Sequence, residues 1–300
     1  KRWPHEEIYY PERSVLGKST IQTGGFLDHI DQFDPRYFNM SQGDAETMSP
    51  EVRLLLETAV QTFEDAGYSR ETLKSKMDGD VAVLVGTMSN HYNIYGVQNM
   101  LTRGAKASGS YTGTMPNMIS YFYGLTGPSL FVDTMCSASL TALDLAVRLL
   151  REGQCRMALA GGVNLLLHPF NMISSSQEHF TSNRAEVIRS FGEGADGTIL
   201  GEGVGTALLK PLREAEKDGD NIQAVILGTA MTNAGARNGF TVPTPGMQAK
   251  AVRDALSDAG VDAATISYIE THGSGTKLGD PIEMSALHDV FGRDGDCLIG

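Results

Sequence analysis

The sequence predicts an α/β protein in which helices and strands alternate and pack as α/β/α layers. Short apolar segments that end in glycine or a polar residue are typical of buried parallel strands. The chain contains such a segment at 81–86, and further short strands are expected at 129–132, 157–163 and 205–209. Longer segments with apolar residues at helical spacing lie between them, and this alternation is typical of a layered fold. With 300 residues the chain can bury a large core, as one large domain or as two fused halves.

The N-terminal part of the chain is expected to be loop, followed by a helix. Residues 1–47 contain several prolines and glycines and are expected to form a surface segment, not packed core. Ser49 is then a suitable N-cap, and Pro50 suits the first helical position. This helix is expected to run to about residue 66, because Gly67 follows as a helix-ending residue.

The middle of the chain contains the first predicted strands. Residues 81–86 indicate a buried parallel strand, and 115–123 indicate a helix. Residues 88–115 combine histidine, tyrosine and asparagine with several glycines and serines, so we expect a mobile region that faces a partner. A strand at 129–132 leads into a helix that ends near residue 150. The apolar residues expected on one face of this helix are Leu140, Leu143, Ala146, Leu149 and Leu150.

The C-terminal part continues the alternation. After the strands at 157–163 and 205–209 we expect a surface helix at 211–218 and a turn at 219–221. We place the join between two halves at this turn, so that about 1–220 form the first half and about 221–300 begin the second. The elements expected after the join are a strand at 224–227, a helix at 248–259 and a strand at 266–270.

Cys136 lies where the strand at 129–132 passes into the following helix. A thiol on such a turn is close to the positive end of the helix dipole, which favours the nucleophilic thiolate. The alternative is a small buried hydrophobe, the usual role of a free cysteine. The other two of the three cysteines, Cys155 and Cys297, have no comparable setting and are expected to be buried structural thiols.

His272 begins a second segment of similar design, with a strand before it, a glycine-rich loop, and then a helix. Asp280 is expected to be the N-cap, Pro281 the first helical residue, and Glu283 the partner that completes a capping box. His272 would then stand at the end of a strand, where side chains project into a cleft. The alternative is a histidine that is hydrogen-bonded within the core.

These two segments resemble the active-site motifs of β-ketoacyl synthases, specifically the ketosynthase domain of modular polyketide synthases. The family patterns are roughly DTACSSSL and HGTGTxLGDPIE, and this chain has DTMCSASL around Cys136 and HGSGTKLGDPIE from His272. The glycine loops at 190–197 and 200–205 and the helix at 49–57 are also similar, in the same order. Asn93 and residues 238–243 resemble ketosynthases whose acyltransferase is a separate protein.

The resemblance implies a thiolase-like α/β/α fold of two pseudo-repeated halves. The family's first strand would precede residue 1, and its lysine and second histidine would follow Gly300, so the resemblance implies a ketosynthase fragment, residues 1–300, that is not competent for condensation alone. It also implies that Cys136 and His272 are catalytic residues of an acyltransferase. The implied reaction is polyketide chain elongation, by decarboxylative Claisen condensation of a cysteine-bound acyl chain with a carrier-bound malonyl-type extender. Phosphopantetheine would arrive on an acyl carrier protein, and the chain would form a homodimer.

Two alternatives remain open at this point. One is a thiolase-fold relative that only transfers or hydrolyses acyl groups, and the other is a ketosynthase-like scaffold that docks carrier proteins without catalysis. Among the departures from the family pattern, Met135 and Leu200 replace a small residue and a proline, and Ser274 replaces threonine. Met135 would narrow the acyl pocket.

Composition restricts the partners and the compartment. The formal net charge is −12 and the pI is about 5.0, which argues against nucleic acid and anionic membranes as partners. No apolar run approaches the roughly 20 residues of a membrane helix. Three cysteines without a CxxC pair fit a reducing cytoplasm. The sequence lacks the HxxH, HExxH and clustered Cys/His patterns of metal sites, and residues 201–205 lack the lysine of a phosphate loop.

Overall fold

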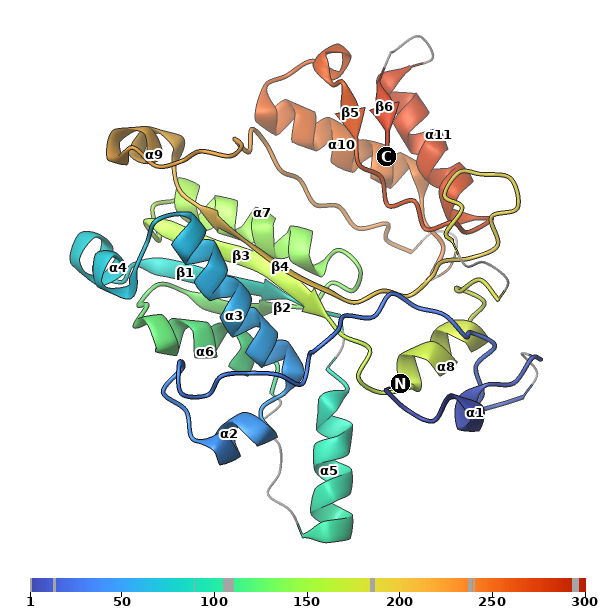
Figure 1. Cartoon of the computed structure of the whole chain (residues 1–300). Coiled ribbons are helices and arrows are strands. Elements are labelled where there is room, and N and C mark those ends of the chain that lie inside the picture. The colour runs from blue at the N-terminus through green and yellow to red at the C-terminus, as the bar shows by residue number, and fades with distance from the viewer. Residues whose placement is uncertain are drawn as a thin grey trace. The chain divides into compact units, whose positions relative to one another are not determined.

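The computed structural model describes residues 2–12, 15–88, 90–104, 111–183, 187–236, 239, 241–292 and 297–300 (Figure 1). The chain divides into two units. The sheet unit comprises residues 26–168 and 201–225, and the second unit comprises residues 1–25, 169–200 and 226–300. Cys136 belongs to the sheet unit and His272 to the second unit.

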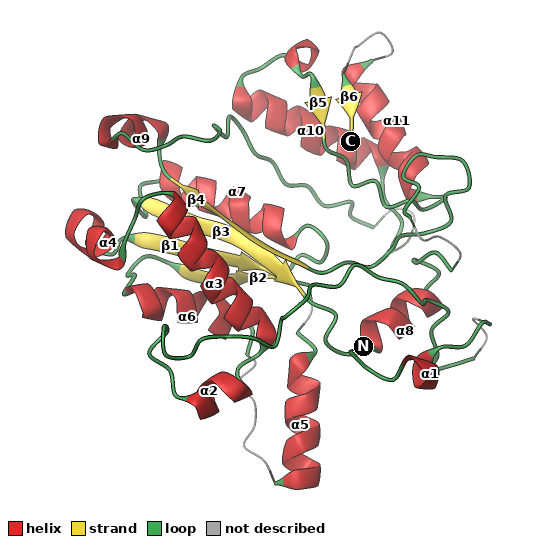
Figure 2. Ribbon diagram, in the orientation of Figure 1, coloured by secondary structure: helices red, strands yellow, loops and turns green. Residues whose placement is uncertain are grey.

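The sheet unit is built on a four-stranded sheet in the order β2-β1-β3-β4 (Figure 2). Strands β1 (Val81–Gly86), β2 (Ser129–Val132) and β3 (Met157–Asn164) are parallel, and β4 (Gly203–Leu209) pairs antiparallel with β3. All four strands lie where the sequence predicts them. Because the parallel strands share a direction, β1, β2 and β3 end at one edge of the sheet, which is also where β4 begins.

Helices cover both faces of this sheet, which confirms the predicted α/β/α layers. On one face lie α3 (Pro50–Asp65) and α6 (Thr114–Tyr123), and on the other lies α7 (Ala138–Arg151) (Figure 1). The alternation along β1 produces the two cores. Val81, Val83 and Val85 pack with α3 and α6, whereas Ala82 and Leu84 pack with α7.

The inner face of α7 differs from the prediction. Leu140 is 70% exposed, and Leu143, Leu149 and Leu150 are only partly buried. Small residues carry the contact with the sheet instead, mainly Ala142 and Ala146. The helix therefore lies close to the strands, where larger side chains would not fit.

The remaining helices of the sheet unit are α2 (Gln42–Thr47), α4 (Arg70–Met77), α5 (Tyr92–Arg103) and α9 (Leu212–Asp218). The prediction for the helix that begins at Pro50 is confirmed, with Ser49 as its N-cap. Residues 92–103 form α5, a helix that the sequence did not predict. The mobility and partner contact expected of residues 88–115 stay predictions, and residue 89 and residues 105–110 lie outside the described residues. Phe38 is buried in the core, so the segment 1–47 is not all surface.

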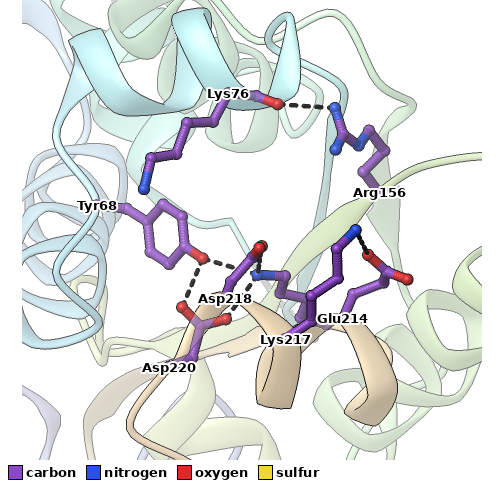
Figure 3. A network of polar contacts seen from close by, with 8 residues as sticks. Tyr68, Lys76, Arg156, Glu214, Lys217, Asp218 and Asp220 are labelled. Atoms are coloured by element: carbon purple, nitrogen blue, oxygen red, sulfur yellow. Dashed lines mark hydrogen bonds and ion pairs between the residues drawn. The ribbon is translucent and has the colours of Figure 1, made fainter.

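A polar network fixes the end of β4 (Figure 3). The ammonium of Lys210 donates hydrogen bonds to Asp218 (2.5 Å), Asp220 (2.6 Å) and the hydroxyl of Tyr68 (2.9 Å). That hydroxyl donates in turn to Asp220, at 2.7 Å. Burial alone would lower the pKa of Lys210, but these hydrogen bonds together raise it above its ordinary value.

The second unit contains α1 (His5–Ile8), α8 (Phe170–Gln177), α10 (Pro245–Ala259), the 3-10 turn η1 (Ala263–Thr265) and α11 (Gly279–Phe291). Its strands are β5 (Tyr268–Ile269) and β6 (Leu298–Ile299), which pair in parallel. The strand expected at 224–227 is not formed, because no described strand pairs with it. The strand expected at 266–270 is confirmed in a shorter form, as β5. Ser19 of the N-terminal segment is buried against α8, where its hydroxyl donates to Met172 O.

Candidate functional site

Cys136 lies on the turn between β2 and α7, and it is exposed. The strand ends at Val132, and Ser137 is the N-cap of a helix that begins at Ala138. The thiol therefore sits just before the first turn of a helix, where backbone N–H groups have no partner within the helix. This is the strand-turn-helix setting predicted from the sequence.

The backbone of this turn has an unusual conformation at the residue before the cysteine. Met135 has a φ of 59°, a left-handed conformation that residues other than glycine rarely adopt. Local hydrogen bonds hold it: Met135 N donates to Asp133 Oδ1 at 2.9 Å, and Ala138 N donates to Met135 O at 3.0 Å. The Ser137 hydroxyl donates to Thr134 O at 3.0 Å. The turn thus directs Cys136 away from the path that the strand would otherwise take.

Two glycines on other strands allow α7 to begin where it does. A β-carbon at Gly86, the last residue of β1, would lie 2.4 Å from the carbonyl carbon of Ala138. A β-carbon at Gly162 on β3 would lie 2.6 Å from Gly86 O and 3.0 Å from the Ser139 β-carbon. Such distances are below van der Waals contact, so side chains are excluded at both positions. The start of α7, and with it Cys136, rests directly on the backbone of the sheet.

His272 follows β5 in the second unit, and it too is exposed. Its backbone N–H donates to Glu283 Oε1 at 2.7 Å, and Gly273 N donates to Glu283 Oε2 at 3.0 Å. One carboxylate on α11 therefore holds two successive amides. Thr271 is fixed from the other side, because its amide and hydroxyl both donate to Gly300 O.

The predicted cap of α11 is wrong. The helix begins at Gly279 with Leu278 as N-cap, and the side chain that accepts from Gly279 N is the Thr276 hydroxyl, at 3.0 Å, not Asp280. Asp280 is buried, and its carboxylate accepts from Phe191 N at 2.7 Å and from the Ser274 hydroxyl at 3.4 Å. Glu283 likewise turns to the His272 loop. Both carboxylates expected to cap the helix instead hold the loops beside it.

The segment 187–198 packs against the His272 loop. The Ser190 hydroxyl donates to Gly273 O, and Gly197 N donates to Gly275 O at 2.9 Å. Beside this contact is a hollow of about 360 Å³, whose lining includes Phe191, Gly192, Thr276, Lys277, Pro281 and Met284. The hydrogen bonds of Asp280 and Glu283 to the loop backbone could not be predicted from the motif alone, since the same residues also fit the pattern of a helix cap.

The other cysteines differ from each other. Cys155 is 3% exposed, and burial raises the pKa of its thiol, as expected of a structural cysteine. Cys297 is half-buried, so the expectation that it is buried is wrong. In the parts of the chain that the structure describes, no cluster of three or more His, Cys, Asp or Glu side chains is placed to hold a metal ion. None of the described helices has the length and apolarity needed to cross a membrane.

Comparison with protein families gives two adjoining matches. Residues 1–215 match the family model described as "Beta-ketoacyl synthase, N-terminal domain", and residues 223–300 match "Beta-ketoacyl synthase, C-terminal domain". Polyketide synthase PksL of Bacillus subtilis is 43% identical over 307 residues, which cover 100% of this chain and 7% of PksL. Polyketide synthase ThaG of Burkholderia thailandensis is 45% identical over 306 residues, which cover 100% of this chain and 5% of ThaG.

The solved structures that resemble this chain are also ketosynthases. The oxazolomycin ketosynthase domain OzmH KS7 of Streptomyces albus matches with a TM-score of 0.93 and 43% identity, over 97% of this chain and 50% of that one. The ketosynthase from module 6 of the bacillaene synthase of Bacillus subtilis matches with a TM-score of 0.87 and 36% identity, over 100% of this chain and 50% of that one. This chain thus spans half the length of these solved ketosynthases and a small part of the curated synthases.

Proposed function

Because the chain belongs to the β-ketoacyl synthase family and has the thiolase-like fold of polyketide ketosynthases, we propose that it takes part in polyketide chain elongation. The observation that carries this proposal is the exposed Cys136 on the turn between β2 and α7. The proposed activity is that of an acyltransferase of the β-ketoacyl-acyl carrier protein synthase type. The proposed substrates are acyl and malonyl-type thioesters, each carried on the phosphopantetheine of an acyl carrier protein.

In the first step, the Cys136 sulfur attacks the carbonyl carbon of the acyl thioester. A new bond forms between that carbon and the Sγ of the Cys136 thiolate, the bond to the carrier's sulfur breaks, and the carrier leaves as its thiolate, which takes a proton from water. The backbone N–H of Cys136 is the proposed donor to the oxyanion that forms on the way. A donor fixed in place before the reaction is effective because it does not have to reorganise as charge develops.

In the second step, His272 acts on the extender. Loss of carbon dioxide from the malonyl-type unit leaves an enolate, and the imidazole N–H donates to the thioester oxygen on which that negative charge develops. The enolate carbon then bonds to the acyl carbon on Cys136, and the Cys136 thiolate leaves. The product on the carrier is longer by two carbons. The two amide hydrogen bonds to Glu283 support this role, since they fix the backbone that carries the imidazole.

We propose a homodimer as the working assembly. Strand β2 is at the edge of its sheet, and Leu130 on it is 43% exposed. An edge strand presents unpaired N–H and C=O groups that can pair with a second strand. Pairing of β2 with its copy about a two-fold axis would complete both sheets. We further propose a separate acyltransferase partner, supported by the sequence resemblance of Asn93 and residues 238–243 to ketosynthases of that type; Asn238 and Phe240 lie outside the described residues.

The test uses the full-length protein and an acyl thioester on its carrier protein. Intact mass and peptide mapping are expected to place the acyl group on Cys136, with none on Cys155 or Cys297, and Cys136→Ala is expected to abolish it. Addition of the malonyl-loaded carrier should then give a lengthened chain on the carrier. Acylation that never leads to a longer product would favour the acyl-transferring alternative. Carrier binding without acylation would favour the scaffold alternative.

A further inference from the structure

The carboxylate of Glu202 joins two separate segments of the sheet unit. Glu202 immediately precedes β4, at the sheet edge where β1, β2 and β3 end. Its Oε2 accepts from Leu27 N at 2.8 Å, and its Oε1 accepts from Leu166 N at 2.7 Å, just after β3. We call Leu27, Leu166 and Glu202 the Glu202 clamp. Both oxygens of this one carboxylate thus accept backbone amides, from segments that are far apart in the sequence.

Glu51, in the first turn of α3, is a second carboxyl group near the clamp. It is 1% exposed, and neither of its carboxylate oxygens accepts a hydrogen bond from the described residues. Buried charges are normally paired and hydrogen-bonded, because transfer of an unpaired carboxylate from water is very unfavourable. The proposed mechanism leaves this group unused, and its burial requires a physical explanation.

The charged groups that act on Glu51 do not compensate its burial. Arg53, on the same helix, favours the charged form, but its Nη1 donates to Asp31 O at 3.3 Å and not to Glu51. Glu202, from the segment before β4, is negative and disfavours a second negative charge. The Glu51 backbone amide and the Ser49 hydroxyl lie close to the carboxyl and favour its charged form more than Arg53 does, but burial outweighs all three. No other charged group among the described residues acts on Glu51 appreciably.

We propose that Glu51 is an uncharged carboxylic acid in the folded protein and makes the Glu202 clamp sensitive to pH near neutrality. Burial, with a smaller contribution from Glu202, raises the pKa of Glu51 from its ordinary value of 4.5 to about 7. Below this range the two glutamates carry one negative charge, which the clamp's amides stabilise. Above it, a second charge forms beside the first in a site shielded from water, and the clamp weakens.

The sign of the effect follows from proton linkage. The folded protein binds the Glu51 proton more tightly than the unfolded chain does, so the contribution of this proton to stability is complete below pH 4.5. It is lost as the pH rises toward 7, and above pH 7 it changes no further. Between pH 5 and pH 8 the unfolding equilibrium constant is therefore expected to rise by roughly 10²-fold because of Glu51 alone.

The experiment compares wild-type full-length protein with Glu51→Gln and with Glu71→Gln as the matched control. Glu71 also lies in the first turn of its helix, α4, but it is exposed. Urea unfolding between pH 5 and pH 8 gives the unfolding constant. Glu51→Gln is expected to lose the roughly 10²-fold change assigned to Glu51, whereas Glu71→Gln is expected to keep the wild-type profile. Identical profiles for all three proteins would overturn the proposal.

Two measurements on the wild type do not depend on whether the variant folds. Infrared spectroscopy is expected to show a protonated carboxyl band at pH 6 that disappears by pH 9. Hydrogen exchange at the Leu27 and Leu166 amides, corrected for the intrinsic effect of pH, is expected to accelerate over the same range. Absence of the carboxyl band at pH 6, or unchanged protection of both amides, would contradict the proposal.

Discussion

Cys136 and His272 are held in place by different physical means. The Cys136 turn is fixed by the contact of backbone with backbone, since α7 begins directly on Gly86 and Gly162. The His272 loop is fixed by carboxylates, since Glu283 and Asp280 accept hydrogen bonds from the amides of His272, Gly273 and Phe191. Both residues are exposed and follow a strand. The two sites are alike in this respect, but the interactions that hold their backbones in place are different.

This difference determines which substitutions each site tolerates. Close packing is sensitive to added volume, because a protein core has little free space. Carboxylate anchors are sensitive to loss of charge or of an acceptor, and insensitive to a modest change of volume. The Cys136 site should therefore fail on gain of a methyl group, and the His272 site on loss of a carboxylate.

The largest effect is expected for Gly86→Ala. The new β-carbon would overlap Ala138, which must shift together with the start of α7. We expect destabilisation of about 3 kcal/mol and loss of Cys136 acylation, measured by urea unfolding and intact mass. Gly43→Ala in α2 is the control, because open space surrounds that position. Normal acylation of Gly86→Ala would contradict the claim that close packing of α7 on the sheet holds the Cys136 turn.

Glu283→Ala tests the other site. Loss of both acceptors should free the His272 and Gly273 amides and slow extender decarboxylation by roughly 10-fold or more, equivalent to about 1.4 kcal/mol or more. Cys136 acylation should remain at the wild-type rate. Glu283→Gln keeps one oxygen acceptor, so its decarboxylation rate should lie between those of wild type and Glu283→Ala. Glu216→Ala on α9 is the control and should change neither decarboxylation nor acylation. An equal loss of both steps in Glu283→Ala would show that the carboxylate supports the whole fold.

Tyr68→Phe tests whether the Cys136 turn depends on backbone packing alone or also on a carboxylate network elsewhere in the sheet unit. The Lys210 network of Figure 3 holds the end of β4 through carboxylates, within the unit that carries Cys136. Removal of the Tyr68 hydroxyl eliminates a donor to Asp220 and an acceptor for Lys210. We expect destabilisation of about 1 kcal/mol by urea unfolding, with unchanged Cys136 acylation. A defect in acylation would indicate that this network supports the Cys136 turn after all.

The smallest effect is expected for Met135→Gly. Glycine adopts positive φ without the steric penalty of an L-residue, so the turn should be stabilised by up to about 1 kcal/mol. Met135→Ala also removes most of the side chain but keeps the steric cost of a positive φ. Comparison of the two variants therefore separates the effect of backbone strain from the effect of side-chain volume in the acyl pocket. If both accept bulkier acyl thioesters than wild type, the side chain limits the pocket, as the sequence suggests. Equal stability of the two variants would argue against backbone strain at this position.

The sequence was sufficient to predict the positions of the four strands of the sheet unit and of Cys136 after β2, but not the strand order or the antiparallel direction of β4. Strands β1 and β3 are largely apolar and mostly buried, and such segments have a strong local signal. The inner face of α7 was wrong at Leu140 because the depth of a helix over a sheet depends on residues elsewhere, here Gly86 and Gly162. The division of the chain into halves near residue 220 stays a prediction.

The helix-cap error at α11 has a similar cause. Asp280 and Glu283 fit the cap pattern in local sequence, but Phe191 and His272 compete for the same oxygens and are brought there by the fold. Local sequence does not contain the partner. The strand expected at 224–227 is absent for the same reason, since apolar residues form a strand only where another strand pairs with them.

The contact of Gly86 and Gly162 with α7 has a consequence for protein engineering. The segment 133–140 around Cys136 cannot be transferred to another protein by itself, because its geometry depends on the absence of side chains at glycines on two other strands. A nucleophile grafted onto another scaffold would need a host whose neighbouring strands also lack side chains beneath the new helix. A database search for this turn should accordingly require glycine on the adjacent strands in addition to the cysteine motif, which would reject look-alike sequences that cannot adopt it.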